Sequence, residues 1–185
     1  MTSKQYLEIE NPHRLITPGS VAVISVGNGR KDNLFSVAWN MPLRKEPPMV
    51  AILAGKGHYS YSFINETGEF GFNIPDISIA KQVIKAGKVS GSEIDDKFDY
   101  VGLERQKAGK IKAPLLAEAI ARLECRVSKV EDMGSSVLLI AQILRSEVRE
   151  DCWKDNQWDF SNGLQMIHHM GGNKFAVSDK SIAVE

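Results

Sequence analysis

The chain has 185 residues, of which 43% are hydrophobic and 25% are charged, as in ordinary globular domains. Lysine plus arginine and aspartate plus glutamate each total 23, so no basic excess indicates nucleic-acid binding. The apolar runs are too short to span a bilayer, the polar N-terminus lacks a signal core, and the two cysteines, Cys125 and Cys152, are too few for a disulfide framework or a zinc site. We therefore expect one cytoplasmic domain over residues 1–185, with reduced thiols and no nucleic-acid or membrane partner.

The first half of the chain is predicted to contain strands separated by turns. The segments are rich in β-branched and apolar residues, and one of them, residues 47–55, is the continuous apolar run typical of a strand buried on both faces. The predicted strands cover residues 20–26, 34–42, 47–55 and 69–75.

Two helices are predicted between and after these strands. The first covers residues 60–68, with Ser60 as the N-cap and a glycine at its end. The second covers residues 76–87, with Ser78 as the cap and Gly87 as the stop.

The second half is expected to add long strands. Residues 113–120 favour a helix by composition, but alternating apolar residues from Ala121 onward indicate a strand. A long strand is expected over residues 135–150 and a polar, aromatic loop over residues 150–163. Many strands with a few short helices favour a mostly-β barrel with helices at its edge.

Most catalytic motifs are absent from the sequence. There is no phosphate-binding P-loop and no G-x-S-x-G elbow, and the glycines at 27 and 29 lack the third glycine of a dinucleotide fingerprint. His168 and His169 are adjacent, so they point in different directions, and no carboxylate stands at ligand spacing. A structural role, or a place in the wall of a site, is the expectation for one of them.

The start of the first helix has the composition of an anion site. Lys56 and His58 lie just before Ser60, so two cationic side chains and a hydroxyl meet where a helix presents unpaired N–H groups. The same residues could form an ordinary turn and cap. The nearby cations, which a cap does not need, favour the anion site.

Five segments taken together resemble the flavin reductase-like family. They carry "SVAW", "PP", "TGEFGFNIP", "SGSEIDDKF" and "GGNKF" in the family's order and span most of the chain. The segments are residues 33–52, 58–75, 87–103, 113–125 and 168–175. The resemblance implies an FMN-binding split β-barrel of the Greek-key type with a few peripheral helices.

The resemblance also implies which residues contact FMN. The phosphate would lie by Lys56, His58 and Ser60, and the ring would lie along the strand and loop that match residues 36–41. Lys97 matches a lysine that reaches the flavin in relatives, where a cation near the N1–C2=O edge raises the potential of the flavin. The remaining candidates for cofactor contact are Ser36, Val37, Ala38, Trp39, Asn40, Met41, Ser90 and Phe175. From the sequence alone, Trp39 could equally be a core aromatic.

The chain departs from the family pattern in three places. Many relatives have a histidine where this chain has Ser135 and Ser136. Many also have an arginine where this chain has His58, and because histidine is only partly charged near neutral pH, phosphate binding by this chain is expected to depend more on pH. Residues 150–163 have no clear counterpart and could cover the site or fill a groove of a partner subunit.

The implied function is an NAD(P)H-dependent oxidoreductase in which hydride passes to flavin N5 and the electrons pass to an unknown acceptor. This chemistry belongs to the cofactor, so it needs no catalytic residue of the protein. The alternative is a flavoredoxin-like electron carrier with bound FMN, a redox protein partner and little NAD(P)H activity. A third reading is a flavin-free barrel that binds another phosphate ligand. A homodimer is expected for the family.

Overall fold

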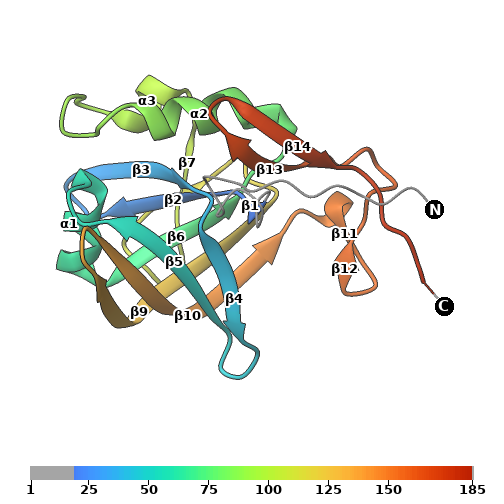
Figure 1. Cartoon of the computed structure of the whole chain (residues 1–185), viewed down its shortest axis with the longest axis horizontal. Helices are drawn as coiled ribbons and strands as arrows, with labels where there is room; N and C mark the ends of the chain where they lie inside the picture. The colour runs from blue at the N-terminus through green and yellow to red at the C-terminus, as the bar shows by residue number, and fades with distance from the viewer. Residues whose placement is uncertain (1–18, 185) are drawn as a thin grey trace, which may run out of the picture.

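A seven-stranded antiparallel sheet dominates the computed structural model, which describes residues 19–184 (Figure 1). Its strand order is β3-β2-β6-β9-β10-β5-β4. The strands are β2 (Ala22–Gly27), β3 (Asp32–Val37), β4 (Asn40–Arg44), β5 (Met49–Gly55), β6 (Glu69–Ile74), β9 (Ala121–Met133) and β10 (Ser136–Val148). Among the strands of this sheet, β6, β9 and β10 follow one another along the chain and lie side by side, and β5, which precedes them, lies beside β10. This is a Greek-key arrangement.

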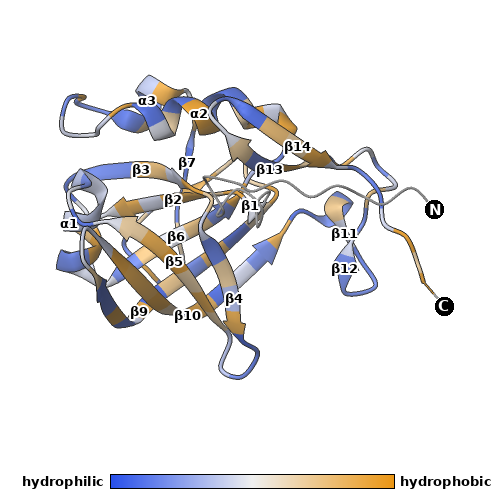
Figure 2. Ribbon diagram, in the orientation of Figure 1, coloured by the Kyte–Doolittle hydropathy of each residue, from blue (hydrophilic) through white to orange (hydrophobic). Residues whose placement is uncertain are grey.

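The sheet curls without closing, because its outer strands β3 and β4 do not pair with each other. Alternate residues of β2 enter two separate cores: Ile24 packs inside the curl with Phe70, and Val23 packs on the outer side with Phe98. Side chains alternate across a strand, so a strand between two cores must be apolar throughout. Figure 2 shows this concentration of hydrophobic residues on the strands. The predicted split barrel is therefore confirmed in its open form.

Helix α1 (Tyr59–Thr67) connects β5 to β6 and ends at Gly68, which has a left-handed backbone conformation. Its N-cap is His58, so the prediction that Ser60 caps this helix is wrong. The hydroxyl of Ser60 instead takes part in a buried hydrogen bond with Asn33.

The second predicted helix forms in two pieces, the 3₁₀ turn η2 (Ile77–Ile79) and α2 (Ala80–Lys88). The Asp76 carboxylate accepts a hydrogen bond from the N–H of Ser78, so Asp76 is the cap and Ser78 is not. Gly87 lies inside α2 and does not end it, because the backbone becomes extended only at Val89. A third helix, α3 (Lys97–Val101), follows, and α2 and α3 cover the outer core.

Three small sheets complete the fold. They are β1–β13–β14, β7–β8 and β11–β12. Their strands are β1 (Gly19–Ser20), β13 (Met166–Gly171), β14 (Lys174–Ser178), β7 (Arg105–Gln106), β8 (Leu115–Leu116), β11 (Trp153–Lys154) and β12 (Gln157–Trp158), with the 3₁₀ turn η3 (Glu150–Cys152) before β11.

Three further expectations need correction. The strand predicted over residues 34–42 is divided into β3 and β4 by a bend at residues 38–39. Residues 113–120 form no helix: Leu115 and Leu116 are buried as β8, and the N–H of Leu116 bonds to the Asn73 side chain. Residues 150–163 contain η3 and the β11–β12 hairpin, in which two tryptophan rings meet edge to face, rather than a simple loop.

Other expectations from the sequence can be placed as follows. Cys125 and Cys152 are free and buried, as expected. Over residues 19–184, the helices are all too short or too polar to cross a membrane. The expectation of no signal segment concerns N-terminal residues that lie outside the described part of the chain.

Candidate functional site

Two hollows lie side by side along β3, where this strand faces α2. We call them the lysine hollow, of about 300 Å³, and the aromatic hollow, of about 230 Å³. Lys97 lines the first, and Phe175 lines the second. Both are lined by Ser36, Gly87 and Lys88, so the two hollows meet at this point. The volume of the lysine hollow lies at the lower end of the range for ligand pockets, and the aromatic hollow alone is smaller than that range.

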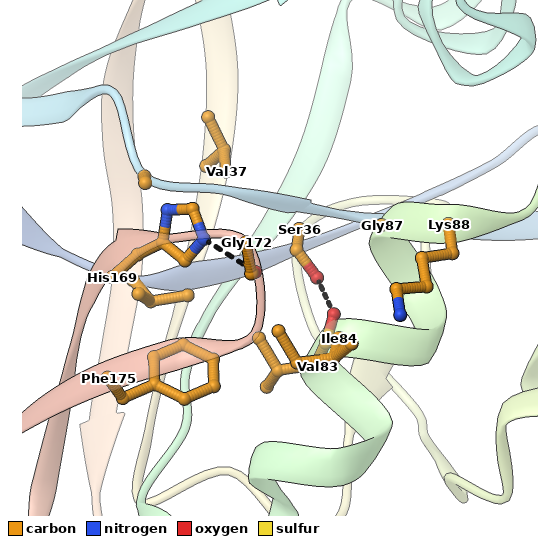
Figure 3. A pocket seen from close by; sticks show the side chains of 11 residues that line it. Ser36, Val37, Val83, Ile84, Gly87, Lys88, His169, Gly172 and Phe175 are labelled. Carbon is orange, nitrogen blue, oxygen red and sulfur yellow. Dashed lines mark hydrogen bonds between the residues drawn. The ribbon is translucent and has the colours of Figure 1, made fainter.

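The close contact between β3 and α2 shapes the junction (Figure 3). The Ser36 hydroxyl donates a hydrogen bond of 2.5 Å to the carbonyl of Val83 on α2. A Cβ atom at Gly87 would lie 3.9 Å from that of Ser36, which is an ordinary contact. The hydroxyl of Ser36 is therefore engaged with the helix, and any ligand contact from this residue falls to its backbone or its Cβ.

The start of α1 borders the lysine hollow through residues 57–60. His58 precedes the helix, and Ser60 is its second residue. The hydroxyl of Ser60 accepts a hydrogen bond of 3.0 Å from Nδ2 of Asn33. The first N–H groups of a helix have no partner within it, and the positive end of the helix dipole lies there. The hollow therefore ends at a place suited to an anion.

Lys97 is the residue that distinguishes this hollow. It is the first residue of α3, it is only 3% exposed, and burial lowers its pKa to about 8. Within residues 19–184 its ammonium group has neither a hydrogen-bond acceptor nor an ion-pair partner. Burial of most of this side chain penalises the charged form, and no protein group in the described part of the chain offsets that penalty. An anion in the lysine hollow would provide that partner.

Two more predicted residues line the lysine hollow, and one does not. His58 and Ser90 are in its wall. Lys56 lies outside it, because its ammonium pairs with Asp132 of β9 at 2.6 Å. This pairing lowers the pKa of Asp132, chiefly through the hydrogen bond from Lys56. Lys56 is thus held at the end of the β9–β10 hairpin, where the backbone carbonyl of Ser135 also accepts a hydrogen bond from the Lys56 N–H.

The aromatic hollow contains Val37, Ala38 and Phe175 as predicted, together with His169. The rings of His169 and Phe175 meet at an angle of 61° with centroids 5.8 Å apart. His168, in contrast, bonds to the Ser178 hydroxyl across β13 and β14. Of the histidine pair, His169 thus lines a hollow, and its place in the wall of a functional site stays a prediction. No group of metal-ligating residues is found among residues 19–184.

The last three predicted ring contacts, Trp39, Asn40 and Met41, are not among the residues that line either hollow. Trp39 is 56% exposed and Met41 is 51% exposed, so Trp39 is not a core aromatic. Asn40 and Met41 line a separate apolar hollow of about 320 Å³, which Trp158 of the β11–β12 hairpin also lines. This hairpin lies at the end of the molecule opposite α1 (Figure 1).

Two residues that line both hollows have no predicted role at the site. They are Gly87 and Lys88, at the end of α2. Lys88 resembles any exposed lysine at the end of a helix in the sequence. Only the packing of α2 on β3 reveals its position.

The open antiparallel barrel, with helices over one side and two joined hollows along β3, defines a split-barrel protein. A family model described as "Flavin reductase like domain" matches residues 14–169. The chain belongs to this family. An uncharacterized protein of Archaeoglobus fulgidus is 32% identical over 148 residues, which is 80% of this chain and 82% of that protein.

Two further relatives bear on function and fold. A protein of Archaeoglobus fulgidus named ferric-chelate reductase (NAD(P)H) is 28% identical over 137 residues, covering 74% of this chain and 79% of that protein. The crystal structure of flavoredoxin from Methanosarcina acetivorans superposes with a TM-score of 0.84 at 23% identity, covering 98% of this chain and 95% of that one. The second likeness shows that the two chains share a fold.

Proposed function

We propose that the two hollows together hold one FMN, with its phosphate in the lysine hollow and its ring along the aromatic hollow. The observation that carries this proposal is Lys97, a buried side chain whose ammonium has no protein partner among residues 19–184 and which lines the same hollow as the start of α1. FMN combines a phosphate with a flat apolar ring. The lysine hollow offers a cation and a helix start to the phosphate, and the aromatic hollow offers Val37 and Phe175 to the ring. Membership of a flavin reductase-like family supports this choice among phosphate ligands.

The phosphate end would be formed by Lys97, Ser60, His58 and Ser90, with the N–H groups at the start of α1. Charge-assisted hydrogen bonds from an ammonium and from helix N–H groups are strong and favour a dianion. The resemblance implied a place for Lys97 at the ring. Its position with Ser60 and His58, across the junction from Phe175, supports a contact with the phosphate instead.

The ring end would use the backbone of residues 36–38 and the side chains of Val37, His169 and Phe175. These residues can orient a flat ring and exclude water from one of its faces. When bound, the flavin supplies the redox chemistry, so the protein needs only to bind it and leave its other face accessible.

The activity we propose is an NAD(P)H-dependent oxidoreductase that passes electrons to an acceptor. The relative named ferric-chelate reductase (NAD(P)H) supports this choice. The second candidate is an electron carrier that uses NAD(P)H poorly, which the structural likeness to flavoredoxin supports.

One kinetic experiment separates these two functions. NADH or NADPH oxidation is followed with the purified protein and excess FMN. Fast turnover supports the oxidoreductase. Negligible turnover with a protein-bound flavin that dithionite reduces supports the carrier, and no flavin binding at all removes both.

We also propose that a second copy of the chain covers the edge strand β4. Met41 and Leu43 of this strand are 51% and 41% exposed, and Trp39, just before the strand, is 56% exposed. An exposed apolar edge strand pairs readily with another chain. The cytoplasmic location and a protein electron acceptor stay predictions.

A further inference from the structure

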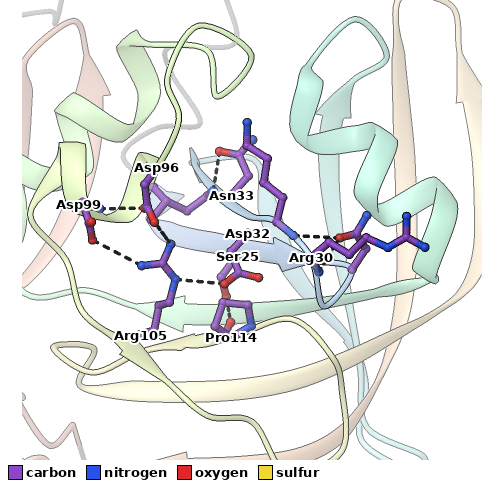
Figure 4. Close-up of polar contacts among 11 residues, drawn as sticks. Ser25, Arg30, Asp32, Asn33, Asp96, Asp99, Arg105 and Pro114 are labelled. Carbon is purple, nitrogen blue, oxygen red and sulfur yellow. Dashed lines mark hydrogen bonds and ion pairs between the residues drawn. The ribbon is translucent and has the colours of Figure 1, made fainter.

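Arg105 lies at the centre of a group of carboxylates behind the lysine hollow (Figure 4). Its Nε donates a hydrogen bond of 3.0 Å to the carboxylate of Asp32, and its Nη2 donates to both carboxylate oxygens of Asp96 at 2.7 and 2.6 Å. Asp99 lies 3.5 Å from Nη1, and the guanidinium stacks on the Phe98 ring at 4.3 Å. One planar side chain thus joins the start of β3 to the first turn of α3.

Asp96 precedes a residue of the proposed phosphate site, and Asp32 precedes a residue that bonds to it. Asp32 precedes Asn33, whose amide donates to the hydroxyl of Ser60. Asp96 is the N-cap of α3, accepts the N–H of Asp99 as well, and precedes Lys97. Arg105 therefore supports both sides of the lysine hollow without lining it.

Arg105 and its carboxylates are coupled electrostatically. Burial acts to raise the pKa of Asp96, but the hydrogen bond and charge of Arg105, with backbone N–H groups, lower it overall. The pKa of Arg105 is raised in turn by Asp96 and Asp32, against the effect of burial. These carboxylates are thus engaged by Arg105, and none of them pairs with the neighbouring Lys97.

We propose that Arg105 is a positioning residue of the phosphate end: it fixes the starts of β3 and α3 and keeps Asp96 from pairing with Lys97, whose ammonium then faces the lysine hollow. This inference rests on the proposed function, because it names how that site is held ready. A lysine could not replace Arg105 fully, since an ammonium cannot donate in fork geometry to two carboxylates at once.

The test is a double-mutant cycle on ligand binding with Arg105→Met, Lys97→Met and the double variant. FMN and riboflavin, which lacks the phosphate, are titrated against each by fluorescence. Arg105→Met is expected to weaken FMN binding about tenfold. This is the lower end of the loss of affinity seen when residues that orient metal ligands are replaced. Riboflavin binding should change less than twofold. In the Lys97→Met background, the same substitution should have much less effect on FMN, because residues in one network are not additive.

Two further variants keep the result interpretable. Arg105→Lys should fall between wild type and Arg105→Met, and it replaces Arg105→Met if that protein does not fold. Arg149→Met is the matched control, since it removes an arginine that pairs with the exposed Asp151 away from the site. It should leave FMN binding unchanged.

The failure of this inference differs from the failure of the proposed function. Wild-type protein that does not bind FMN contradicts the function itself. Wild-type binding with an unaltered Kd in the Arg105 variants overturns the positioning role. Equal losses for FMN and riboflavin, or fully additive effects with Lys97→Met, also overturn it, because they indicate a general structural role.

Discussion

The side-chain amide of Asn33 donates a hydrogen bond of 3.0 Å to the hydroxyl of Ser60, across the space between β3 and α1. Asn33 is 1% exposed, and its oxygen accepts the N–H of Leu34 at 2.8 Å, which fixes the orientation of the amide. A Cβ atom at Gly91 would lie 2.4 Å from this amide, so the loop with Ser90 packs directly on it. Asn33 thus links three parts of the lysine hollow: β3, the start of α1 and the loop at residues 90–91.

This link predicts the effect of Asn33→Asp. The new carboxylate keeps the acceptor for Leu34 but cannot donate to Ser60, and it adds negative charge beside the proposed phosphate. FMN binding should weaken by about 1–3 kcal/mol. Calorimetry of FMN binding measures the loss. Asn162→Asp, at an exposed position that bonds only to the carbonyl of Asp151, is the control. Equal affinity of both variants would contradict a role of Asn33 at the site.

Lys97→Met should have opposite effects on stability and on binding. Without a ligand, the variant loses a buried cation that has no partner, so its free energy of unfolding should rise by about 1–3 kcal/mol. FMN binding should weaken at the same time, because the phosphate loses its ammonium. Thermal denaturation and FMN titration measure the two effects. Lys81→Met, at an exposed position on α2, should change neither.

The potential of the bound flavin distinguishes two places for Lys97. An ammonium at the phosphate leaves the potential of Lys97→Met protein close to that of wild type. An ammonium at the ring, as the resemblance implied, would stabilise the reduced flavin, so its loss would lower the potential. A lowered potential would therefore contradict the arrangement that the lysine hollow supports.

Burial of Lys97 also predicts two effects of pH. Its pKa is about 8 in the folded chain, against an ordinary value of 10.5. Between these values the unfolded chain holds the proton that the folded chain has lost, so the contribution of Lys97 to stability rises from pH 8 to 10.5. FMN affinity should fall over the same range as the ammonium loses its charge. In Lys97→Met both effects should disappear, while His58, Tyr59 and Lys88, the other titratable residues in this wall, remain.

The edge strand β4 predicts a dimer that a charge disrupts. Met41→Glu would place a carboxylate on the exposed apolar side of this strand and should convert a homodimer into a monomer. Light scattering with size-exclusion chromatography measures the mass. Met133→Glu, at a similarly exposed methionine of β9, is the matched control and should remain dimeric. A dimer unaffected by Met41→Glu and Leu43→Glu would place the interface elsewhere.

Much of the fold follows from local patterns. The apolar residues of β2 and β5 predict strands, and both strands form. β2 contributes to both cores, whereas β5, which the sequence predicts to be buried on both faces, contributes Val50, Ile52 and Ala54 to the inner core only. The errors occur where tertiary contacts decide. Residues 113–120 have a helical composition, yet contacts of Pro114 and Leu116 with the buried Ser25 and Asn73 hold them extended.

The candidate site, like the fold, follows from the sequence only in part, because contacts between distant segments also shape it. Ser36, His58, Ser60 and Lys97 do line one hollow, although no spacing in the sequence relates the first three to Lys97. The resemblance to the family placed them together. Lys56 was included because it precedes the helix, but the partner that draws it away, Asp132, lies on a strand distant in the sequence. Ion pairs between distant segments have no local signal.

The most direct test of the account is a titration of the wild-type protein with FMN and with riboflavin at pH 7, followed by flavin fluorescence and calorimetry. If the lysine hollow holds the phosphate, FMN should bind with one site per chain and more tightly than riboflavin by about 1.5–3 kcal/mol, the contribution of a charged hydrogen bond. Equal affinity for the two ligands, or no binding of FMN, would contradict the central claim.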